Sequence, residues 1–362
     1  MAWDQNLLQK LADDVLGMLR REHAEDARSA GHLSMENWEW PTGVALYGIW
    51  KTYEHTRKPE TLAYLADWYG RWLSKPAPHR NVNTVAPMLA LTCMYAHADP
   101  RPDYLPHIQR WADWVAQEMP RTEFGGLQHI TVWNKHYQQL WADTLFMTVL
   151  FLAKAGLTLG QRAWVEEAKY QFLLHAKYLQ DRVSGLWNHG WTFDCRHGFA
   201  GAHWARGNGW FTAAAVELLS LLENADDAAA RMIRAALEDQ VSALWKLQRE
   251  SGLFTTLIDV EETYEETSAS AAIAFGVLKG VRIGVLGEGY RSMGEQAARA
   301  VLARIAPDGT VTGVSGGTGM GHDLDHYKRI PQCPTAYGQG LTFLMLTELM
   351  AAGDKGAGSA LG

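Results

Sequence analysis

Cysteine is scarce in this sequence of 362 residues, which contains only Cys93, Cys195 and Cys333. The three are far apart, odd in number and without C-x-x-C spacing, which argues against a disulfide framework and a cysteine-based zinc site. This scarcity suits a reducing compartment, and we expect a cytoplasmic protein.

Concentrated positive charge is missing as well. Lys and Arg number 33 against 40 Asp and Glu, the formal net charge is -7, and no Lys/Arg-rich run occurs. Without such a run, the chain lacks the electrostatic attraction that drives binding to nucleic acid or to an anionic membrane. We therefore expect neither as a partner.

Long hydrophobic runs are also absent. The longest covers residues 145–153, with Thr148 inside it, and is far short of the roughly 20 residues that cross a bilayer. The first residues place Asp4, Lys10 and Asp13 in an amphipathic pattern, instead of a basic region followed by an apolar block. That pattern predicts no signal peptide.

Several catalytic motifs do not occur: GxxxxGK[ST], HExxH, GxSxG and paired Cys/His ligand spacing. Phosphate transfer on a P-loop, zinc hydrolysis and serine-triad chemistry therefore have no support. Nothing in the sequence requires a metal or an organic cofactor, and we predict none.

Aromatic residues, in contrast, are plentiful, with 16 Trp, 13 Tyr and 10 Phe. The flat face and single N–H donor of Trp suit stacking on sugar rings. Most of these residues are more simply interpreted as core side chains between helices. The sugar hypothesis therefore concerns only those that fall inside polar motifs.

Helical spacing of apolar residues dominates the chain, and strict alternation with β-branched residues is nearly absent, which predicts an all-α fold. About twelve helices, in six pairs, are expected from the apolar periodicity and its breaks. They begin near Asp4, Thr42, Pro59, Asn83, Asp103, Gln138, Gly160, Trp204, Asp226, Glu265, Gly287 and Pro334.

The expected helices alternate in character. One set has ordinary charged faces, as in residues 107–119 and 162–179, while the other carries few charges and begins with polar and aromatic clusters. A helix that is apolar all round is buried, so the second set forms an inner ring and the first an outer ring. The prediction is an (α/α)6 barrel of six helical hairpins that occupies residues 1–362 as a single domain.

All inner helices of such a barrel run in the same direction, so their polar and aromatic clusters meet at one mouth. Helix N-termini there present free N–H groups and favour an anionic ligand. Ordinary helix caps are the alternative, but caps do not need tryptophan. The tryptophans in these clusters are Trp38, Trp40, Trp141, Trp204 and Trp210.

Asp143, in the segment QQLWADTLFM, is the first candidate for a general acid. Its apolar neighbours Trp141, Leu145 and Phe146 would raise the pKa of its carboxyl group. A position in a first helical turn would instead lower that pKa through the helix dipole. Spacing leaves the two alternatives open.

Further candidates lie in the other motifs of the mouth. His189 lies in the segment SGLWNHGW, where it either binds a ligand or is a capping or core histidine. The guanidinium of Arg206 either binds a carboxylate through two N–H groups or makes an internal salt bridge. The segment GGLQHITVW contributes His129, and NWEWPTG contributes Trp40, Thr42 and Gly43, whose N–H groups are expected to be exposed. Residues 306–331 are rich in glycine and form a long loop that we expect to close over the mouth.

Taken together, the motifs resemble those of glycoside hydrolase family 105, the unsaturated rhamnogalacturonyl hydrolases and related unsaturated uronyl hydrolases. The resemblance covers nearly the whole chain. The motifs that carry it, in the order of the family, are NWEWPTGVALYGI, NVNTVAPML, GGLQHIT, QQLWADTLFMTVLFLAKAG, SGLWNHGW, HWARGNGW, ETSASAAIAFGVLKG and SGGTGMGHDLDHYKRIPQCPTAYGQ.

The resemblance implies an exo-acting enzyme that removes a 4,5-unsaturated uronic acid from short oligosaccharides left by polysaccharide lyases. In such enzymes the aspartate at the position of Asp143 protonates C4 of the vinyl ether, and C5 then takes water. It also implies sugar contacts at matching positions, namely His189, Trp141, Trp204, Arg206 and Trp210. Asn83 stands where rhamnogalacturonan-acting relatives have an assisting Asp, and Ile130 where they have Lys, so the leaving sugar or the terminal uronate is expected to differ.

Two other functions remain as alternatives. An epimerase of the N-acylglucosamine 2-epimerase type shares the barrel and would use two histidines as acid and base. A non-enzymatic protein with an aromatic sugar-binding cleft is the second. The expected partner in the enzymatic case is a small oligosaccharide, and the sequence gives no sign of the oligomeric state.

Overall fold

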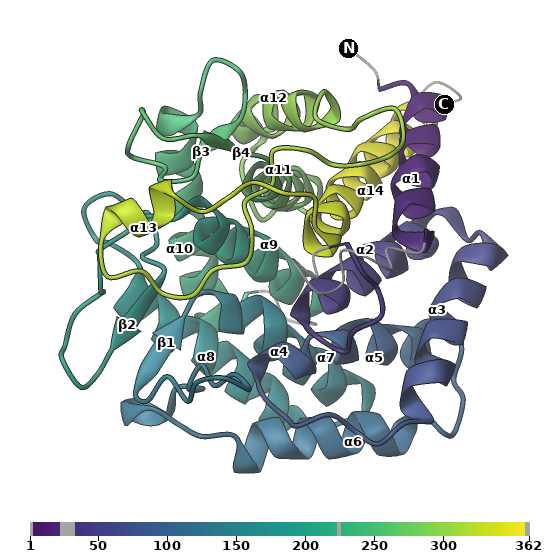
Figure 1. The fold of residues 1–362 in the computed structure, drawn as a ribbon, viewed down its shortest axis with the longest axis horizontal. Helices are drawn as coiled ribbons and strands as arrows, with labels where there is room; N and C mark the ends of the chain where they lie inside the picture. Colours follow the sequence, from purple (N-terminus) through teal and green to yellow (C-terminus); the bar gives the residue numbers. More distant parts are fainter. Residues whose placement is uncertain (1–2, 22–32, 223–225, 359–362) are drawn as a thin grey trace.

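The computed structural model describes residues 3–21, 33–222 and 226–358 and consists largely of helices arranged in two concentric layers (Figure 1). In the inner ring each helix contacts the next, and the last contacts the first. These helices are α2 (Trp40–Thr56), α5 (Pro87–His97), α7 (Leu150–Thr158), α9 (Ala205–Leu221), α11 (Thr267–Arg282) and α14 (Ala336–Gly358).

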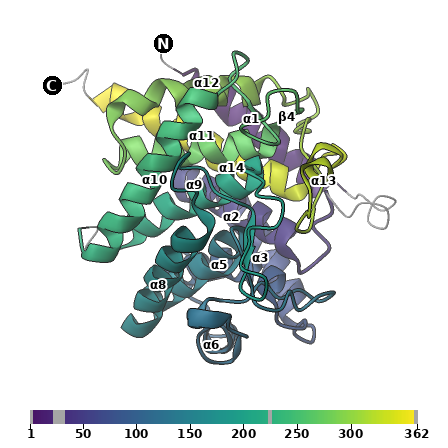
Figure 2. The same ribbon diagram turned by 90° about the vertical axis from the view of Figure 1, so that its left-hand side faces the viewer.

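The outer layer packs against this ring. It consists of α1 (Gln5–Arg20), α3 (Pro59–Leu73), α6 (Leu105–Asp113), α8 (Arg162–Leu179), α10 (Ala228–Leu247) and α12 (Arg291–Leu302). Inner and outer helices alternate along the chain. In Figure 2, α8 and α10 lie on the outside of the molecule, and α9 and α2 lie nearer its centre. The predicted all-α (α/α)6 barrel is confirmed.

Burial explains this division of the helices. In α11 every side chain from Thr267 to Val281 is buried, whereas α10 buries a stripe that includes Ile233 and Leu237 and exposes its opposite face. Close packing of α2 on α14 depends on glycine, because a Cβ built at Gly340 would lie 2.7 Å from the Cα of Ala45. One cluster of buried hydrophobic side chains extends from the first helix to the last.

Short strands replace one predicted helix start. The helix expected from Gln138 begins later, because strand β1 (Gln139–Trp141) pairs antiparallel with β2 (Gly190–Thr192). Gln138 itself has φ of 54°, a left-handed conformation incompatible with a helix start. A π-helical turn, η3 (Leu145–Val149), then leads into α7.

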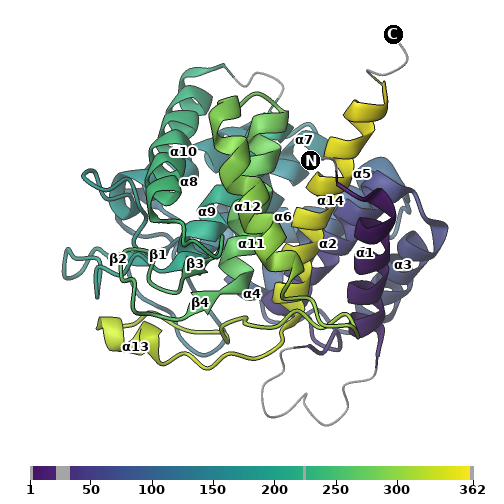
Figure 3. The same ribbon diagram turned by 90° about the horizontal axis from the view of Figure 1, so that it is seen from above.

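The remaining short elements surround the N-terminal ends of the inner helices. Strands β3 (Phe254–Thr255) and β4 (Glu265–Glu266) and helices α4 (Val82–Val85) and α13 (Leu324–Lys328) lie along one edge of the barrel in Figure 3. We call this end the mouth. Single turns complete the fold: η1 (Trp114–Glu118), η2 (Glu123–Gly125) and η4 (Glu288–Tyr290). None of the helices in the described residues is long and apolar enough to cross a membrane.

Candidate active site

A cleft of about 360 Å³ opens at the mouth. Among its lining residues are seven that the sequence predicts: Trp40, Asn83, His129, Trp141, Asp143, Trp204 and Arg206. The rest were not predicted individually, namely Thr131, Trp133, Asn134, His136, Met147 and the segment 317–319. The last of these belongs to the glycine-rich loop, so part of this loop lines the cleft, and its closure over the mouth stays a prediction.

Asp143 lies at the inner end of the cleft, at the start of the helical turn that precedes η3. Its side chain is 16% exposed, and Oδ2 lies 3.3 Å from Nε2 of His189. The alignment of these two atoms falls outside hydrogen-bond geometry, so both lack a hydrogen-bond partner among the described residues. A buried polar atom without a partner is available to a ligand.

The pKa of Asp143 reflects opposing influences. Burial raises it, but the adjacent imidazole of His189, with Arg206 beyond, outweighs burial and holds the pKa below its usual value. Of the two alternatives left open by the sequence, the lowered pKa is therefore correct for the unliganded protein. Its main cause is the histidine.

His189 is held from several sides. The imidazole lies between Trp141 and Trp204, with ring centroids 5.3 and 4.2 Å away, and is 1% exposed. Its Nδ1 is 2.8 Å from the hydroxyl of Tyr327, which also accepts a hydrogen bond from the amide of Gly321. Tyr327 of α13 thus links the glycine-rich loop to His189 and keeps Nε2 directed at Asp143.

Trp141 is the centre of an aromatic cluster. His129 stacks on it with centroids 4.0 Å apart and an interplanar angle of 7°, and His136 lies 4.4 Å from the same ring. His129 Nδ1 is 2.9 Å from the Thr144 hydroxyl. Burial lowers the pKa of His129 to about 3, so this imidazole is neutral and can exchange hydrogen bonds with a hydroxyl group.

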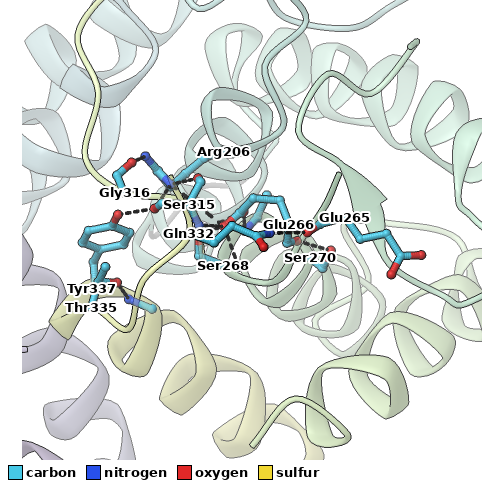
Figure 4. Close-up of polar contacts among 12 residues, drawn as sticks. Arg206, Glu265, Glu266, Ser268, Ser270, Ser315, Gly316, Gln332, Thr335 and Tyr337 are labelled. Carbon is cyan, nitrogen blue, oxygen red and sulfur yellow. Dashed lines mark hydrogen bonds and ion pairs between the residues drawn. The ribbon is translucent and has the colours of Figure 1, made fainter. Parts of the chain in front are cut away.

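Arg206 connects α9 to the glycine-rich loop (Figure 4). Its guanidinium lies between the rings of Trp204 and Tyr337 and donates to the carbonyls of Ser315 and Gly316, both at 2.8 Å. Glu266 is 4.0 Å away. Internal contacts therefore occupy most of the guanidinium, but Nε has no partner among the described residues and the side chain lines the cleft.

Glu266 stabilises the part of the glycine-rich loop that Arg206 contacts. Its carboxylate caps α11 through the amides of Ser268 and Ala269 and accepts a hydrogen bond of 2.8 Å from the amide of Ser315. The residue is completely buried. Glu266 was not among the predicted site residues, although it lies in the quoted segment ETSASAAIAF.

Four predicted binding residues are not among those that line the cleft: Thr42, Gly43, His189 and Trp210. Trp210 is fully buried and supports Trp40 edge-on at 6.2 Å. Thr42 is buried, and the amide of Gly43, expected to be exposed, donates to the carbonyl of Glu39 at 3.0 Å. The expectation of an exposed N–H is therefore wrong for Gly43, because this N–H already takes part in the first turn of α2.

A second carboxyl group lies beside the cleft. Burial raises the pKa of Glu39, and hydrogen bonds from the Trp40 amide and the Asn83 side chain offset only part of this effect. Asn83 itself lines the cleft. Among the described residues, no three His, Cys, Asp or Glu side chains are grouped so that they could hold a metal ion.

The sequence is similar to those of known proteins along most of its length. The model of the family described as Glycosyl Hydrolase Family 88 matches residues 16–352. The unsaturated rhamnogalacturonyl hydrolase YesR of Bacillus subtilis is 33% identical over 318 residues, which cover 86% of this chain and 90% of that protein.

Two solved structures have the same fold as this chain over nearly its full length. A possible member of the GH105 family from Salmonella enterica serovar Paratyphi A is 40% identical with a TM-score of 0.92, and the match covers 97% of this chain and 95% of that chain. A second possible member, from Klebsiella pneumoniae, is also 40% identical, with a TM-score of 0.93 and coverage of 97% and 94%.

Proposed function

Because this chain belongs to glycosyl hydrolase family 88, we propose that it removes a 4,5-unsaturated uronic acid from the non-reducing end of lyase-generated oligosaccharides. It is an unsaturated uronyl hydrolase, and its similarity to the Bacillus subtilis enzyme extends across most of both chains. The similarity to that enzyme favours hydrolysis over the epimerase alternative.

The observation that carries the assignment of roles is the unpartnered carboxylate oxygen of Asp143, inside the cleft and 3.3 Å from His189. In the proposed reaction Asp143 transfers its proton to C4 of the vinyl ether, and the positive charge that develops is shared by C5 and the ring oxygen. The Asp143 carboxylate then takes a proton from water as the water oxygen bonds to C5. Proton transfer by one positioned acid typically contributes about 10²- to 10⁴-fold.

The product of this addition is a hemiketal at C5, which explains how hydration releases the leaving sugar. The hemiketal opens by breaking the bond between C5 and the ring oxygen, which leaves a ketone at C5 and a hemiacetal at C1. The hemiacetal then expels the leaving sugar as an alcohol, and C1 becomes an aldehyde. One carboxyl group therefore suffices, whereas an ordinary glycosidase needs two at a set separation.

The lowered pKa of Asp143 in the unliganded protein is compatible with this acid role. The substrate brings its own carboxylate into the cleft, where it competes for the positive charge of Arg206 and the polarity of the imidazoles. A nearby negative charge disfavours ionisation of Asp143, so its pKa rises when substrate binds. Substrate binding thus promotes the protonated form of the acid.

The remaining lining residues would bind the sugar. We assign Trp40, Trp141 and Trp204 to stacking, and His129, Asn83 and the free Nε of Arg206 to polar contacts. His189 lies behind this lining, with its unpartnered Nε2 directed at Asp143. Trp210 acts indirectly by supporting Trp40.

We further propose that residues 1–362 form one catalytic domain, which is supported by the large buried cluster that extends from the first helix to the last. Action in the cytoplasm stays a prediction.

The proposal is tested by following the ultraviolet absorbance of the C4=C5 enol ether. Purified protein is incubated with unsaturated disaccharides from rhamnogalacturonan, ulvan and glycosaminoglycan. We expect rapid loss of absorbance with at least one of them and a loss of activity of about 10³-fold or more in Asp143→Asn. The matched control is Asp67→Asn, a surface aspartate whose side chain is 71% exposed.

No change in absorbance with any of the disaccharides would contradict the proposed reaction on these substrates. Full activity of Asp143→Asn would contradict the proposed role of the acid. An epimerase would act on saturated sugars and would leave this absorbance unchanged.

A further inference from the structure

We propose that Trp133 is the platform on which the leaving sugar stacks, and that it sets the preference of the enzyme for the sugar next to the unsaturated uronate. Trp133 lines the cleft, yet its side chain is 92% exposed. This inference rests on the proposed function and adds to it a residue that determines specificity.

Depth in the cleft separates the two sugar positions. Asp143 lies at the inner end with a side chain only 16% exposed, whereas Trp133 lies at the solvent-exposed rim. An enzyme that attacks the terminal residue must bring that ring to Asp143, so the next sugar points towards the rim. Trp133 is the most exposed aromatic side chain among the described lining residues, since Trp141 and Trp204 are 3% and 1% exposed and Trp40 is partly buried.

The backbone that carries Trp133 is fixed by its own hydrogen bonds. The amide of Thr131 donates to the carbonyl of Asn134 at 2.8 Å, and the amide of Asn134 donates to the Thr131 hydroxyl at 3.1 Å. Gln128, which is buried, donates to the carbonyl of Lys135 and accepts from the amide of Gln138. The loop therefore presents Trp133 at a defined place.

Local backbone strain points the same way. His136 and Gln138 have φ of 39° and 54°, a region that non-glycine residues rarely adopt. Such strain persists where surrounding contacts impose it, and it is often found at ligand sites. Here it brings the His136 ring to 4.4 Å from Trp141, which couples the loop to the aromatic cluster beside Asp143.

The chemistry of the platform suits a sugar ring. An exposed indole offers a broad apolar face for the C–H face of a pyranose, and its N–H remains free for a hydroxyl group. The other rim segment, Gly317 to Gly319, provides mainly backbone and the hydroxyl of Thr318. Stacking on the leaving sugar therefore depends on Trp133.

The test compares two substrates that share the unsaturated uronate: a disaccharide and the corresponding methyl glycoside, which has no leaving sugar. The variants are Trp133→Ala and Trp133→Phe. The control is Trp245→Ala, which removes a tryptophan that is 50% exposed on α10. Activity is measured as kcat/KM from the loss of ultraviolet absorbance.

We expect Trp133→Ala to lower the ratio of kcat/KM for the disaccharide to that for the methyl glycoside by about tenfold, mainly through KM, in line with the loss of one aromatic contact. Trp133→Phe should restore most of this ratio, and Trp245→Ala should not change it. An unchanged ratio in Trp133→Ala, with both substrates consumed, would overturn the platform alone. A wild-type protein that consumes neither substrate would overturn the proposed function and the platform with it.

Discussion

Two carboxylates at opposite ends of the same barrel, one in the cleft and one fully buried, have very different surroundings. At the mouth, Oδ2 of Asp143 has no hydrogen-bond partner among the described residues. Near the C-terminal ends of the inner helices, Glu217 of α9 is fully partnered. Its Oε1 is 2.6 Å from Nζ of Lys279, and its Oε2 accepts a hydrogen bond of 2.7 Å from Tyr47.

Electrostatics reinforces this contrast. Burial raises the pKa of Glu217, but Lys279, Lys51 and the hydrogen bond from Tyr47 lower it to about 2, so the group is ionised at neutral pH. The net pKa of Asp143 is also lowered, but mainly through the adjacent imidazole of His189. A saturated ion pair contributes to structure, whereas a carboxylate with a free oxygen in a cleft is poised for chemistry.

The largest expected effects come from neutralising each carboxylate in turn. Asp143→Asn should lower activity by about 10³-fold or more, because the proton donor is lost. The free energy of unfolding should change by no more than about 1 kcal/mol, since no hydrogen bond to the unpartnered oxygen is broken. The absorbance assay and urea unfolding measure the two effects.

Glu217→Gln should reduce stability and leave activity nearly unchanged. It leaves the Lys279 ammonium buried without its counter-ion, which costs about 3–5 kcal/mol of unfolding free energy. The molecules that remain folded should keep their kcat, because Glu217 lies outside the cleft lining. A large loss of kcat with unchanged stability in Glu217→Gln would reverse the comparison.

The sequence was sufficient for the features that depend on local pattern. Apolar periodicity predicted the inner and outer helices, and their polar starts predicted a mouth that contains Asp143. Features that depend on contacts between distant segments were missed. His189 and Tyr327 are 138 residues apart, and Glu217 and Lys279 are 62 apart.

The errors of the sequence prediction have a similar origin. The amide of Gly43 looked free because the exact start of α2 was not known, and its bond to the Glu39 carbonyl appears only once the helix is in place. The helix predicted from Gln138 failed because β1 pairs with a strand about 50 residues away. Neither pairing leaves a signal in the local pattern of residues.

A smaller effect should come from Tyr327→Phe. This change removes the hydroxyl that holds Nδ1 of His189, and a hydrogen bond of about 1 kcal/mol corresponds to a loss of roughly fivefold. We expect the loss in kcat more than in KM, because Tyr327 positions His189 and does not line the cleft. A shifted pH profile of kcat should accompany it.

The matched control is Tyr69→Phe, which removes an equally buried hydroxyl bonded to the carbonyl of Pro87. It should reduce stability and leave kcat unchanged. If both variants reduced only stability, Tyr327 would have no role in positioning His189.

The last expected effect develops only gradually with pH and is a difference in acid sensitivity between the two ends. Burial lowers the pKa of His129 to about 3 and that of His175 to about 4, from a usual 6.5. Their unfolded forms therefore bind protons first, and stability is lost as the pH falls below 6.5, by up to about 1.4 kcal/mol per pH unit for each group. Glu217 loses its contribution only below its usual pKa of 4.5, as the pH falls towards 2.

Unfolding by urea at several pH values between 6.5 and 4.5 separates these contributions. His175→Gln should flatten the dependence of the unfolding free energy on pH in this window, because one group that takes up a proton on unfolding is removed. Glu217→Gln should lower the curve and leave its slope unchanged, because Glu217 is ionised in both states over most of the window. An equal slope in His175→Gln and wild type would contradict this. It would show that protonation of carboxylates, and not of buried histidines, causes the loss of stability at low pH at both ends of the barrel.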